Sequence, residues 1–332
     1  MSADKTLFSS MDFQIKLLGA LSVGDVRTGT IPSPLPSQKH YLKVYIIWTV
    51  LVLLACVMPA SLAPSVAGET ANIPQRIVSL SPSITEGLFQ LGLGDKVVGV
   101  TTFCKRPAGA LQKPRIGTVM APNIEAIVSI RPDIVIASET NPPQHLGRLR
   151  SLGIKTMVLP PEKSYADICR SFLTLGTALG VVKSAKAVIA SADKRISIIQ
   201  RNLKTAAPVR VFWEAGAQPL VTMGPGTFID QLISMGGGLN IARHAPARYV
   251  RYSREEVLKQ DPEAIILVTM GDVTRNEITA WRKYKALRAV KNNRIHVVDA
   301  HFVCSPTPLA FAGGLEIVSK LLHPEICPKP TP

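Results

Sequence analysis

Few residues of this 332-residue chain are arranged for covalent chemistry. The sequence holds no nucleophile elbow, P-loop, dinucleotide fingerprint or HExxH pair, and its six histidines form no ligand-spaced pair. Glycine clusters at 92–94 and 236–238 follow predicted helices instead of opening them, which is typical of helix ends. These patterns argue against an enzyme, a resident cofactor and a metal centre, and they direct attention to binding.

Two residues that could contact a ligand stand on loops where predicted strands end. Cys104 follows the strand 96–100, and His301 follows the strand 294–298. Ligands of open α/β sheets bind at such carboxyl ends. Cys104 is compatible with a metal or haem ligand, with half of a disulfide, or with a small residue of the cleft. His301 is compatible with a ligand contact or with a solvated loop histidine.

Aromatic residues make up only 5% of the chain, and four of them fall near predicted strand or loop ends on one side. Aromatic faces hold flat, partly apolar ligands in clefts of this kind. Trp213 and Phe302 are equally compatible with a place in the core. The predicted ligand-binding set is therefore Phe103, Cys104, Trp213, Tyr249, His301 and Phe302.

One stretch of sequence occurs twice, at 123–136 and again at 253–266. Each copy reads as a helix N-cap, a short helix, a proline stop and a buried strand. Without a gap, Glu125 aligns with Glu255 and Pro132 with Pro262. Either glutamate alone suits the positive end of a helix dipole. Their equivalence also suits a partner with twofold symmetry that contacts one carboxylate on each copy.

The repeat indicates two similar lobes with a ligand cleft between them. Strands alternate with helices in both parts, which predicts an α/β fold of two Rossmann-like lobes with mostly parallel sheets. Apolar residues keep a helical spacing from Val182 to Leu203, so a single long, rigid helix is expected to join the lobes. We place the first lobe at 69–181, the connecting helix at 182–204 and the second lobe at 205–332.

Residues 1–68 are predicted to be an N-terminal extension that contains an export signal or anchor. An uncharged apolar run at 44–57 follows Lys39, His40 and Lys43. It is short for a membrane span, which needs about 20 apolar residues, and it fits the core of a signal peptide. Cleavage after small residues near 61–67, lipidation at Cys56 and an uncleaved anchor are three alternatives. All three place residue 70 onward outside the cytoplasm.

Export would permit disulfides among Cys104, Cys169, Cys304 and Cys327, and the three full pairings remain open. The net charge of +15 is spread along the chain without a basic run interleaved with aromatics, so a nucleic-acid partner is not expected. Such a basic surface can favour anionic ligands or anionic lipid headgroups.

The chain resembles the periplasmic substrate-binding proteins of ABC importers, in the cobalamin, ferric-siderophore and haem class. The resemblance covers about Gln75 to Glu325 and is carried by RIVSLSPSITE, LGLGDKVVGVT, PNIEAIVSIRPDIVIAS, SREEVLKQDPEAIIL and WRKYKALRAVKNNRIHVVD. It implies two α/β lobes joined by one long helix. It also implies that Glu125 and Glu255 dock onto the membrane subunits of the importer.

The ligand stays open within this class. The stretch VGVTTFCKRP is similar to one found in members that bind cobalamin, which places Phe103 in the pocket. The segments 119–122 and 138–139 lack the tryptophans that sandwich the corrin in such members. We therefore expect a protein that captures a metal chelate (cobalamin, ferric siderophore or haem) and delivers it to an ABC importer's transmembrane dimer and its ATPase. A sensory binding protein and an exported α/β enzyme are the alternatives.

Overall fold

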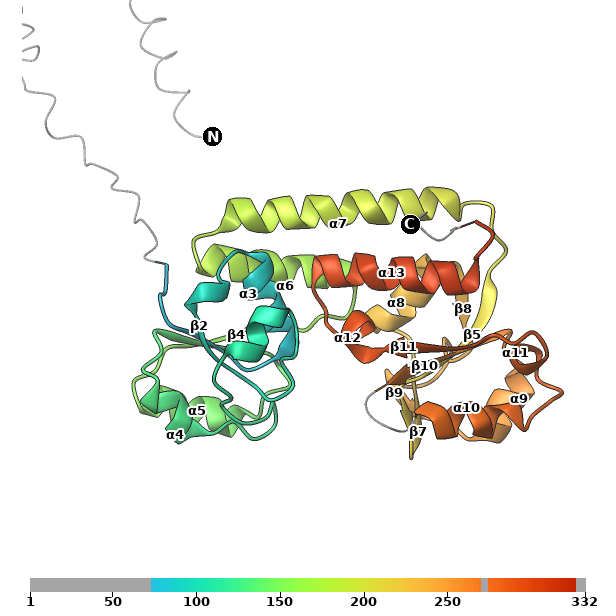
Figure 1. The fold of residues 1–332 in the computed structure, drawn as a ribbon, viewed down its shortest axis with the longest axis horizontal. Helices are drawn as coiled ribbons and strands as arrows, with labels where there is room; N and C mark the ends of the chain where they lie inside the picture. The colour runs from blue at the N-terminus through green and yellow to red at the C-terminus, as the bar shows by residue number, and fades with distance from the viewer. Residues whose placement is uncertain (1–72, 270–273, 327–332) are drawn as a thin grey trace, which may run out of the picture. The chain divides into compact units, whose positions relative to one another are not determined.

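The computed structural model describes residues 73–269 and 274–326 (Figure 1). The predictions for residues 1–68, including the apolar run at 44–57 and Cys56, lie outside the described residues, as does Cys327. Two parallel sheets organise the described chain. We call the residues around the first sheet (73–178) the first half and those around the second sheet (209–326) the second half.

The first half is built on a four-stranded sheet in the order β2-β1-β3-β4, in which every neighbouring pair is parallel. Continuous apolar runs form these strands because a parallel sheet is covered on both faces. The strands are β1 (Ile77–Ser79), β2 (Val97–Val100), β3 (Ile134–Ala137) and β4 (Thr156–Val158). The helices are α3 (Pro82–Gln90), η1 (Gly94–Lys96), η2 (Ala108–Gln112), α4 (Ile124–Ser129), α5 (Pro143–Ser151) and α6 (Tyr165–Ala178).

The second half repeats this plan with the strand order β11-β10-β5-β8, again parallel throughout. A small antiparallel sheet, β6-β7-β9, is added to it. The strands are β5 (Val209–Glu214), β6 (Gly216–Ala217), β7 (Leu220–Met223), β8 (Gly238–Asn240), β9 (Tyr249–Arg251), β10 (Ala264–Thr269) and β11 (Ile295–Asp299). The helices are α8 (Phe228–Met235), α9 (Arg254–Gln260), α10 (Thr274–Arg282), α11 (Arg288–Lys291), α12 (Ala300–Val303) and α13 (Pro308–Leu322). The α/β class with mostly parallel sheets is thus confirmed.

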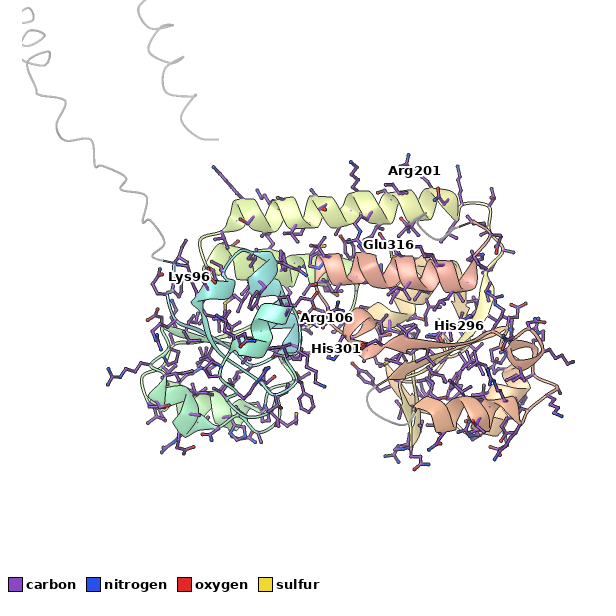
Figure 2. The ribbon with its side chains drawn as sticks, in the orientation of Figure 1. Lys96, Arg106, Arg201, His296, His301 and Glu316 are labelled. Atoms are coloured by element: carbon purple, nitrogen blue, oxygen red, sulfur yellow. The ribbon has the colours of Figure 1, made fainter. Side chains whose placement is uncertain are left out.

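Helix α7 (Val182–Asn202) connects the two halves in sequence and contributes to the cores of both. Ala185 packs with the first core, whereas Ala192 and Ile196 pack with the second. The helix runs alongside α6 and α13 (Figure 1). Arg195 of α7 and Glu316 of α13 form an ion pair at 2.8 Å, and Figure 2 labels Glu316 on α13. Within the described ranges no helix has both the length and the apolarity to cross a membrane.

The sequence repeat is also a repeat of local structure. The Asn123 side chain accepts a hydrogen bond from the amide of Ala126, and the Ser253 hydroxyl accepts one from the amide of Glu256. The residues just before the two prolines, Arg131 and Asp261, both adopt left-handed backbone conformations, with φ of 44° and 45°. Each copy then enters a strand beside the first strand of its sheet, β3 beside β1 and β10 beside β5.

Candidate functional site

A cavity of about 780 Å³ is lined by residues from both halves. Its walls follow the carboxyl ends of strands, where open α/β sheets bind ligands. Phe103 follows β2, Glu139 follows β3 and Glu162 follows β4, while His301 lies in α12, which begins directly after β11. The other lining residues include Pro82, Lys105, Val119, Thr140, Lys163, Met223, Thr227, Phe228, Arg248, Tyr249, Ala300, Cys304 and Ser305.

Two aromatic side chains that line this cavity, one from each half, are largely exposed. Phe103 of the first half is 56% exposed, and Tyr249 of the second half is 68% exposed. Aromatic rings usually bury most of their surface, because burying such a ring removes a large apolar area from water. A ligand that enters the cavity would cover both rings, so this pair is the chief apolar feature of the site.

Charged side chains of both signs line the same cavity. Lys105, Lys163 and Arg248 are exposed there, and Glu139 is exposed on the first half's wall. Glu162 is mostly buried and accepts a hydrogen bond from the Ser171 hydroxyl at 2.9 Å. Burial raises the pKa of the Glu162 carboxyl from 4.5 to about 7. The cavity can therefore meet a ligand that has apolar faces and ionised substituents.

The two halves also touch each other beside the cavity. The Gln90 amide on α3 donates to the hydroxyl of Thr307, the N-cap of α13, at 3.0 Å. Burial raises the pKa of Glu86 on the same helix, while nearby Arg106 and a hydrogen bond with Ser305 of the second half lower it. Figure 2 shows Arg106 and His301 in the region between the two sheets. A polar contact across the halves thus accompanies the cavity.

The sequence profile of the periplasmic binding proteins matches residues 77–301, which is more than half of the chain. The chain belongs to this family. An uncharacterised ABC transporter substrate-binding lipoprotein of Bacillus subtilis is 30% identical over 259 residues, which cover 76% of this chain and 81% of the relative. Both the description of the family and the name of this relative denote binding proteins.

Two crystal structures support the same fold. That of the periplasmic vitamin B12 binding protein of Vibrio cholerae has a TM-score of 0.66 and 27% identity, and it covers 76% of this chain and 97% of its own. That of a periplasmic haem-binding protein from Pseudomonas aeruginosa has a TM-score of 0.68 and 27% identity, with coverage of 76% and 94%. Both neighbours are binding proteins, and the similarity spans both halves of this periplasmic binding protein.

The structure brings three of the six predicted ligand-binding residues together in the cavity of this periplasmic binding protein. These residues are Phe103, Tyr249 and His301. Phe302 lies in α12 beside His301, and its side chain is outside the described part of the structure. Among the described residues no group of three or more His, Cys, Asp or Glu side chains is placed to hold a metal ion.

The structure places Cys104 and Trp213 away from the cavity, in the cores of the two halves. The Cys104 amide donates to the Thr101 carbonyl, and this turn directs the thiol inward to the Thr85 and Thr101 hydroxyls, each at 3.1 Å. Trp213 is the next-to-last residue of β5, which pairs with β10, and it is fully buried. Cys104, Cys169 and Cys304 are all free thiols.

The sequence did not predict the cavity residues Lys105, Lys163, Arg248 and Glu162. Glu162 and Lys163 follow Pro160 and Pro161 at the end of β4, so the rule that sites lie at strand ends could have found them. Arg248 follows no strand and precedes β9 of the small antiparallel sheet. No sequence pattern predicted this small sheet, and without the sheet nothing placed Arg248 at the cavity.

Glu125 and Glu255 lie outside the cavity, on exposed helix starts. Both occupy the second position of their helices, α4 and α9. Hydrogen bonds from the Glu255 backbone and from Ser253 lower the pKa of Glu255, which keeps this carboxylate ionised. In Figure 1 α4 and α9 are on the side of their sheets away from α7. The two carboxylates are accessible to a partner and remote from the ligand cavity.

Replacing Glu162 by glutamine should stabilise the protein in a pH-dependent way. The carboxyl has a pKa of about 7 in the folded chain and 4.5 in the unfolded chain. The folded state therefore binds the proton more tightly, and the wild type loses stability as pH rises from about 4.5 to 7. A glutamine keeps the bond to Ser171 and avoids that loss. We expect a gain of about 2 kcal/mol at pH 8 that disappears near pH 4.5, measured by urea unfolding.

The matched control is Glu139→Gln, on the same wall but exposed. A surface substitution of this kind should change the free energy of unfolding by less than about 0.5 kcal/mol at either pH. An equal gain for Glu162→Gln at pH 4.5 and pH 8 would contradict the burial of an ionisable carboxyl at this position.

Proposed function

We propose that this chain is an extracytoplasmic solute-binding protein that captures a metal chelate and delivers it to an ABC importer. The observation that carries the proposal is the 780 Å³ cavity at the strand ends of two α/β halves, which is lined by the exposed rings of Phe103 from one half and Tyr249 from the other. Two aromatic faces suit a flat macrocycle or an aromatic chelator, and the mixed charges beside them suit its polar substituents.

Cobalamin or another corrinoid is the first candidate, with haem or a ferric siderophore as the alternatives within the class. The names of the Vibrio cholerae and Pseudomonas aeruginosa neighbours support vitamin B12 and haem respectively. The side chains proposed to contact the ligand are Phe103, Tyr249 and His301, joined by Glu162 and Arg248. Phe302 remains a proposed contact through its place in α12.

The lobe boundaries of the proposal are 69–181 and 205–332, with residues 182–204 as the connecting helix. Because α7 packs with both cores, it would limit the opening of the cleft more than a glycine-rich linker would. Delivery would then depend on contact with the importer, and we assign this contact to Glu125 and Glu255. The transmembrane dimer of the importer would meet both carboxylates, and its ATPase would drive transport.

The proposed location is outside the cytoplasm, which the periplasmic and lipoprotein relatives support. Residues 1–68 would supply the export signal, through the apolar run at 44–57. Cleavage, lipidation at Cys56 and retention as an anchor would each leave the cavity on the same side of the membrane.

Spectroscopic titration with cyanocobalamin, haemin and a ferric hydroxamate siderophore tests the ligand class. One of the three should bind with a dissociation constant at or below about 1 μM. Phe103→Ala and Tyr249→Ala should each weaken that binding at least about tenfold, because each removes a ring that the ligand covers.

Leu152→Ala is the matched control, since Leu152 is an exposed apolar residue outside the cavity. It should leave the dissociation constant unchanged. The proposal fails if none of the three chelates binds more tightly than about 10 μM, or if the ring variants bind like the control.

A further inference from the structure

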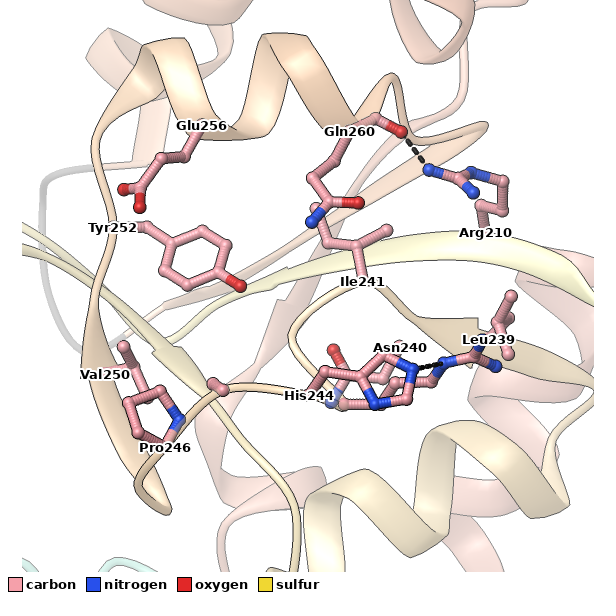
Figure 3. Close-up of a pocket in the computed structure, with 12 residues that line it drawn as sticks. Arg210, Leu239, Asn240, Ile241, His244, Pro246, Val250, Tyr252, Glu256 and Gln260 are labelled. Atoms are coloured by element: carbon pink, nitrogen blue, oxygen red, sulfur yellow. Dashed lines mark hydrogen bonds between the residues drawn. The ribbon is translucent and has the colours of Figure 1, made fainter.

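Two buried asparagines, one in each half, contact the backbone of residues that line the cleft. Asn141 lies in the loop after β3 and is 2% exposed, and Asn240 is the last residue of β8 and is 3% exposed. Neither of them lines the cleft. Figure 3 shows Asn240 across a small cavity from α9. A buried amide side chain costs free energy unless its donors and its acceptor are paired, so the partners of each asparagine show what it holds in place.

Asn141 joins three segments of the first half. Its Oδ1 accepts a hydrogen bond from the Ser138 amide at 2.8 Å. Its Nδ2 donates to the carbonyl of Leu80, which follows β1, at 3.2 Å and to the carbonyl of Val119 at 2.9 Å. Val119 lines the cleft, as do the two residues between Ser138 and Asn141. Asn141 thus fixes the wall of the cleft that belongs to the first half onto the ends of two strands.

Asn240 does the same for the second half. Its Oδ1 accepts a hydrogen bond from the Ala242 amide at 3.0 Å, and its Nδ2 donates to the Met223 carbonyl and to a carboxylate oxygen of Asp230, each at 2.8 Å. Met223 lines the cleft and pairs with Tyr249 in the antiparallel sheet. Asp230 is in the first turn of α8, and the first two residues of that helix also line the cleft.

The two backbone segments that the asparagines hold are equivalent in the internal repeat. Extending the alignment of the two copies toward the N-terminus places Val119 on Tyr249, six residues before Glu125 and Glu255 respectively. Asn141 holds Val119 directly, whereas Asn240 holds Met223, the sheet partner of Tyr249. The asparagines themselves do not align in the repeat. The same arrangement is therefore built twice from different elements, as expected if both walls need a fixed position.

Packing alone gives these walls little support. Tyr249 is 68% exposed, and Met120, the neighbour of Val119, is 63% exposed. Segments with few buried apolar contacts open locally at low cost in free energy. Hydrogen bonds to buried side chains such as Asn141 and Asn240 are the contacts that can keep such a backbone in one position.

We propose that Asn141 and Asn240 are positioning residues of the cleft, each of which holds the wall of its own half in the position that ligand binding requires. The inference rests on the proposed function, in which the cleft binds a metal chelate. Each asparagine acts through a carbonyl, of Val119 or of Met223, and not by touching the ligand. A wall that is fixed before the ligand arrives lowers the entropy cost of binding.

Hydrogen exchange on the full-length protein tests where each asparagine acts. Asn141→Ala should raise the exchange rates of the amides at 117–123 at least about tenfold and leave those of β7 and β9 unchanged, because the loosening would be local. Asn240→Ala should do the reverse, so each variant is the control for the other. If Asn141→Ala does not fold, Asn141→Asp replaces it in both measurements, since it keeps the acceptor for the Ser138 amide and loses only the two donated bonds.

Ligand titration tests what the asparagines contribute to binding. Whichever of cyanocobalamin, haemin and a ferric hydroxamate siderophore binds the wild type should bind about tenfold more weakly to each alanine variant, because the freed wall must be ordered on binding. Ser319→Ala is the matched control. It removes a buried hydrogen bond to the Leu315 carbonyl within α13, and Ser319 does not line the cleft. It should leave the dissociation constant unchanged, and circular dichroism would confirm that every variant is folded.

The inference is overturned if Asn141→Ala and Asn240→Ala raise the exchange rates evenly over both halves, which would indicate a loss of stability alone. It is also overturned if either variant, with its own wall loosened, binds the chelate as tightly as Ser319→Ala does. A wild type that binds none of the three chelates would refute the proposed function, whereas the exchange rates would still decide whether the two asparagines hold the walls.

Discussion

Reversal of both Glu125 and Glu255 to arginine is expected to reduce ligand uptake at least about 100-fold while ligand affinity in the cleft stays unchanged. In the proposed docking, which the family resemblance implies is made to arginines of the importer subunits, each reversal would bring two cations together, and like charges brought together at an interface cost several kcal/mol. A cost of only about 1.4 kcal/mol at each of the two positions would lower the affinity for the importer about 100-fold in total. Both side chains are exposed and neither lines the cleft, so ligand binding has no reason to change.

The measurement pairs uptake of a labelled ligand by the reconstituted importer with titration of the same ligand in solution. Asp95→Arg combined with Glu325→Arg is the control, because these exposed carboxylates give the same change in net charge away from α4 and α9. An arginine in the first turn of each helix should cost no more than about 1 kcal/mol of stability. Uptake by the Glu125 and Glu255 variant at the rate of the control would falsify the docking role.

Long periodic patterns and the internal repeat made much of the fold predictable. The apolar spacing from Val182 to Leu203 predicted one helix, and α7 spans Val182–Asn202. The apolar run at 133–137 predicts a buried strand, and β3 spans Ile134–Ala137. In both cases the local pattern and the tertiary burial favour the same structure, so no long-range information was needed.

Other helices differ from their predictions because of long-range contacts. The residue pattern predicts a single basic helix from about Asn276 to Leu287, whereas the structure has α10 ending at Arg282 and α11 beginning at Arg288. Between the two helices the amide of Tyr284 donates to the Trp281 carbonyl and that of Leu287 to the Tyr284 carbonyl, and these turns bring Leu287 into the core cluster of Trp281. Charge spacing does not reveal such turns. The pattern also predicts the last helix near Gly313 to Leu322, whereas α13 begins at Pro308, with Thr307 as its N-cap.

The site was predictable to the level of strand ends but not of side-chain direction. Phe103 and His301 follow strands and both line the cavity, and their contact with a ligand stays a prediction. Cys104 is the next residue after Phe103, yet it is fully buried because the turn at Thr101 points it into the core. A shift of one residue thus decides whether a side chain lines the cavity or enters the core, and sequence spacing alone does not determine which residue does which.

A buried charged cluster beneath α9 provides the second large effect. Arg254, the first residue of α9, pairs with Glu277 at 2.6 Å and lies 4.5 Å from the centroid of the Trp281 ring. The indole of Trp281 donates to Glu214 at 2.6 Å. Glu214 is only 4% exposed and Glu277 only 7%. One guanidinium therefore neutralises a region that holds two nearly buried carboxyls.

Arg254→Met is expected to lower the free energy of unfolding by about 3–5 kcal/mol, because it leaves buried carboxyls without their cation. Burial raises the pKa of Glu214 to about 7, so this carboxyl is protonated in the folded chain at pH 5 and ionised at pH 8. The wild type already loses stability from Glu214 as pH rises from about 4.5 to 7. The loss caused by Arg254→Met should accordingly be larger at pH 8 than at pH 5, as urea unfolding at the two pH values would measure.

A double-mutant cycle separates the ion pair from the packing of Arg254 on Trp281. Adding Glu277→Gln to Arg254→Met removes the unpaired charge and should restore at least about 1.5 kcal/mol. Arg195→Met, which breaks the half-exposed pair with Glu316, is the control and should cost less than about 1 kcal/mol. If Arg254→Met costs no more than this control, Arg254 does not neutralise the buried carboxyls. Arg254 immediately precedes Glu255. A large loss of free energy of unfolding in Arg254→Met would therefore also mean that the buried cluster holds the start of α9 in place, together with the carboxylate assigned to docking.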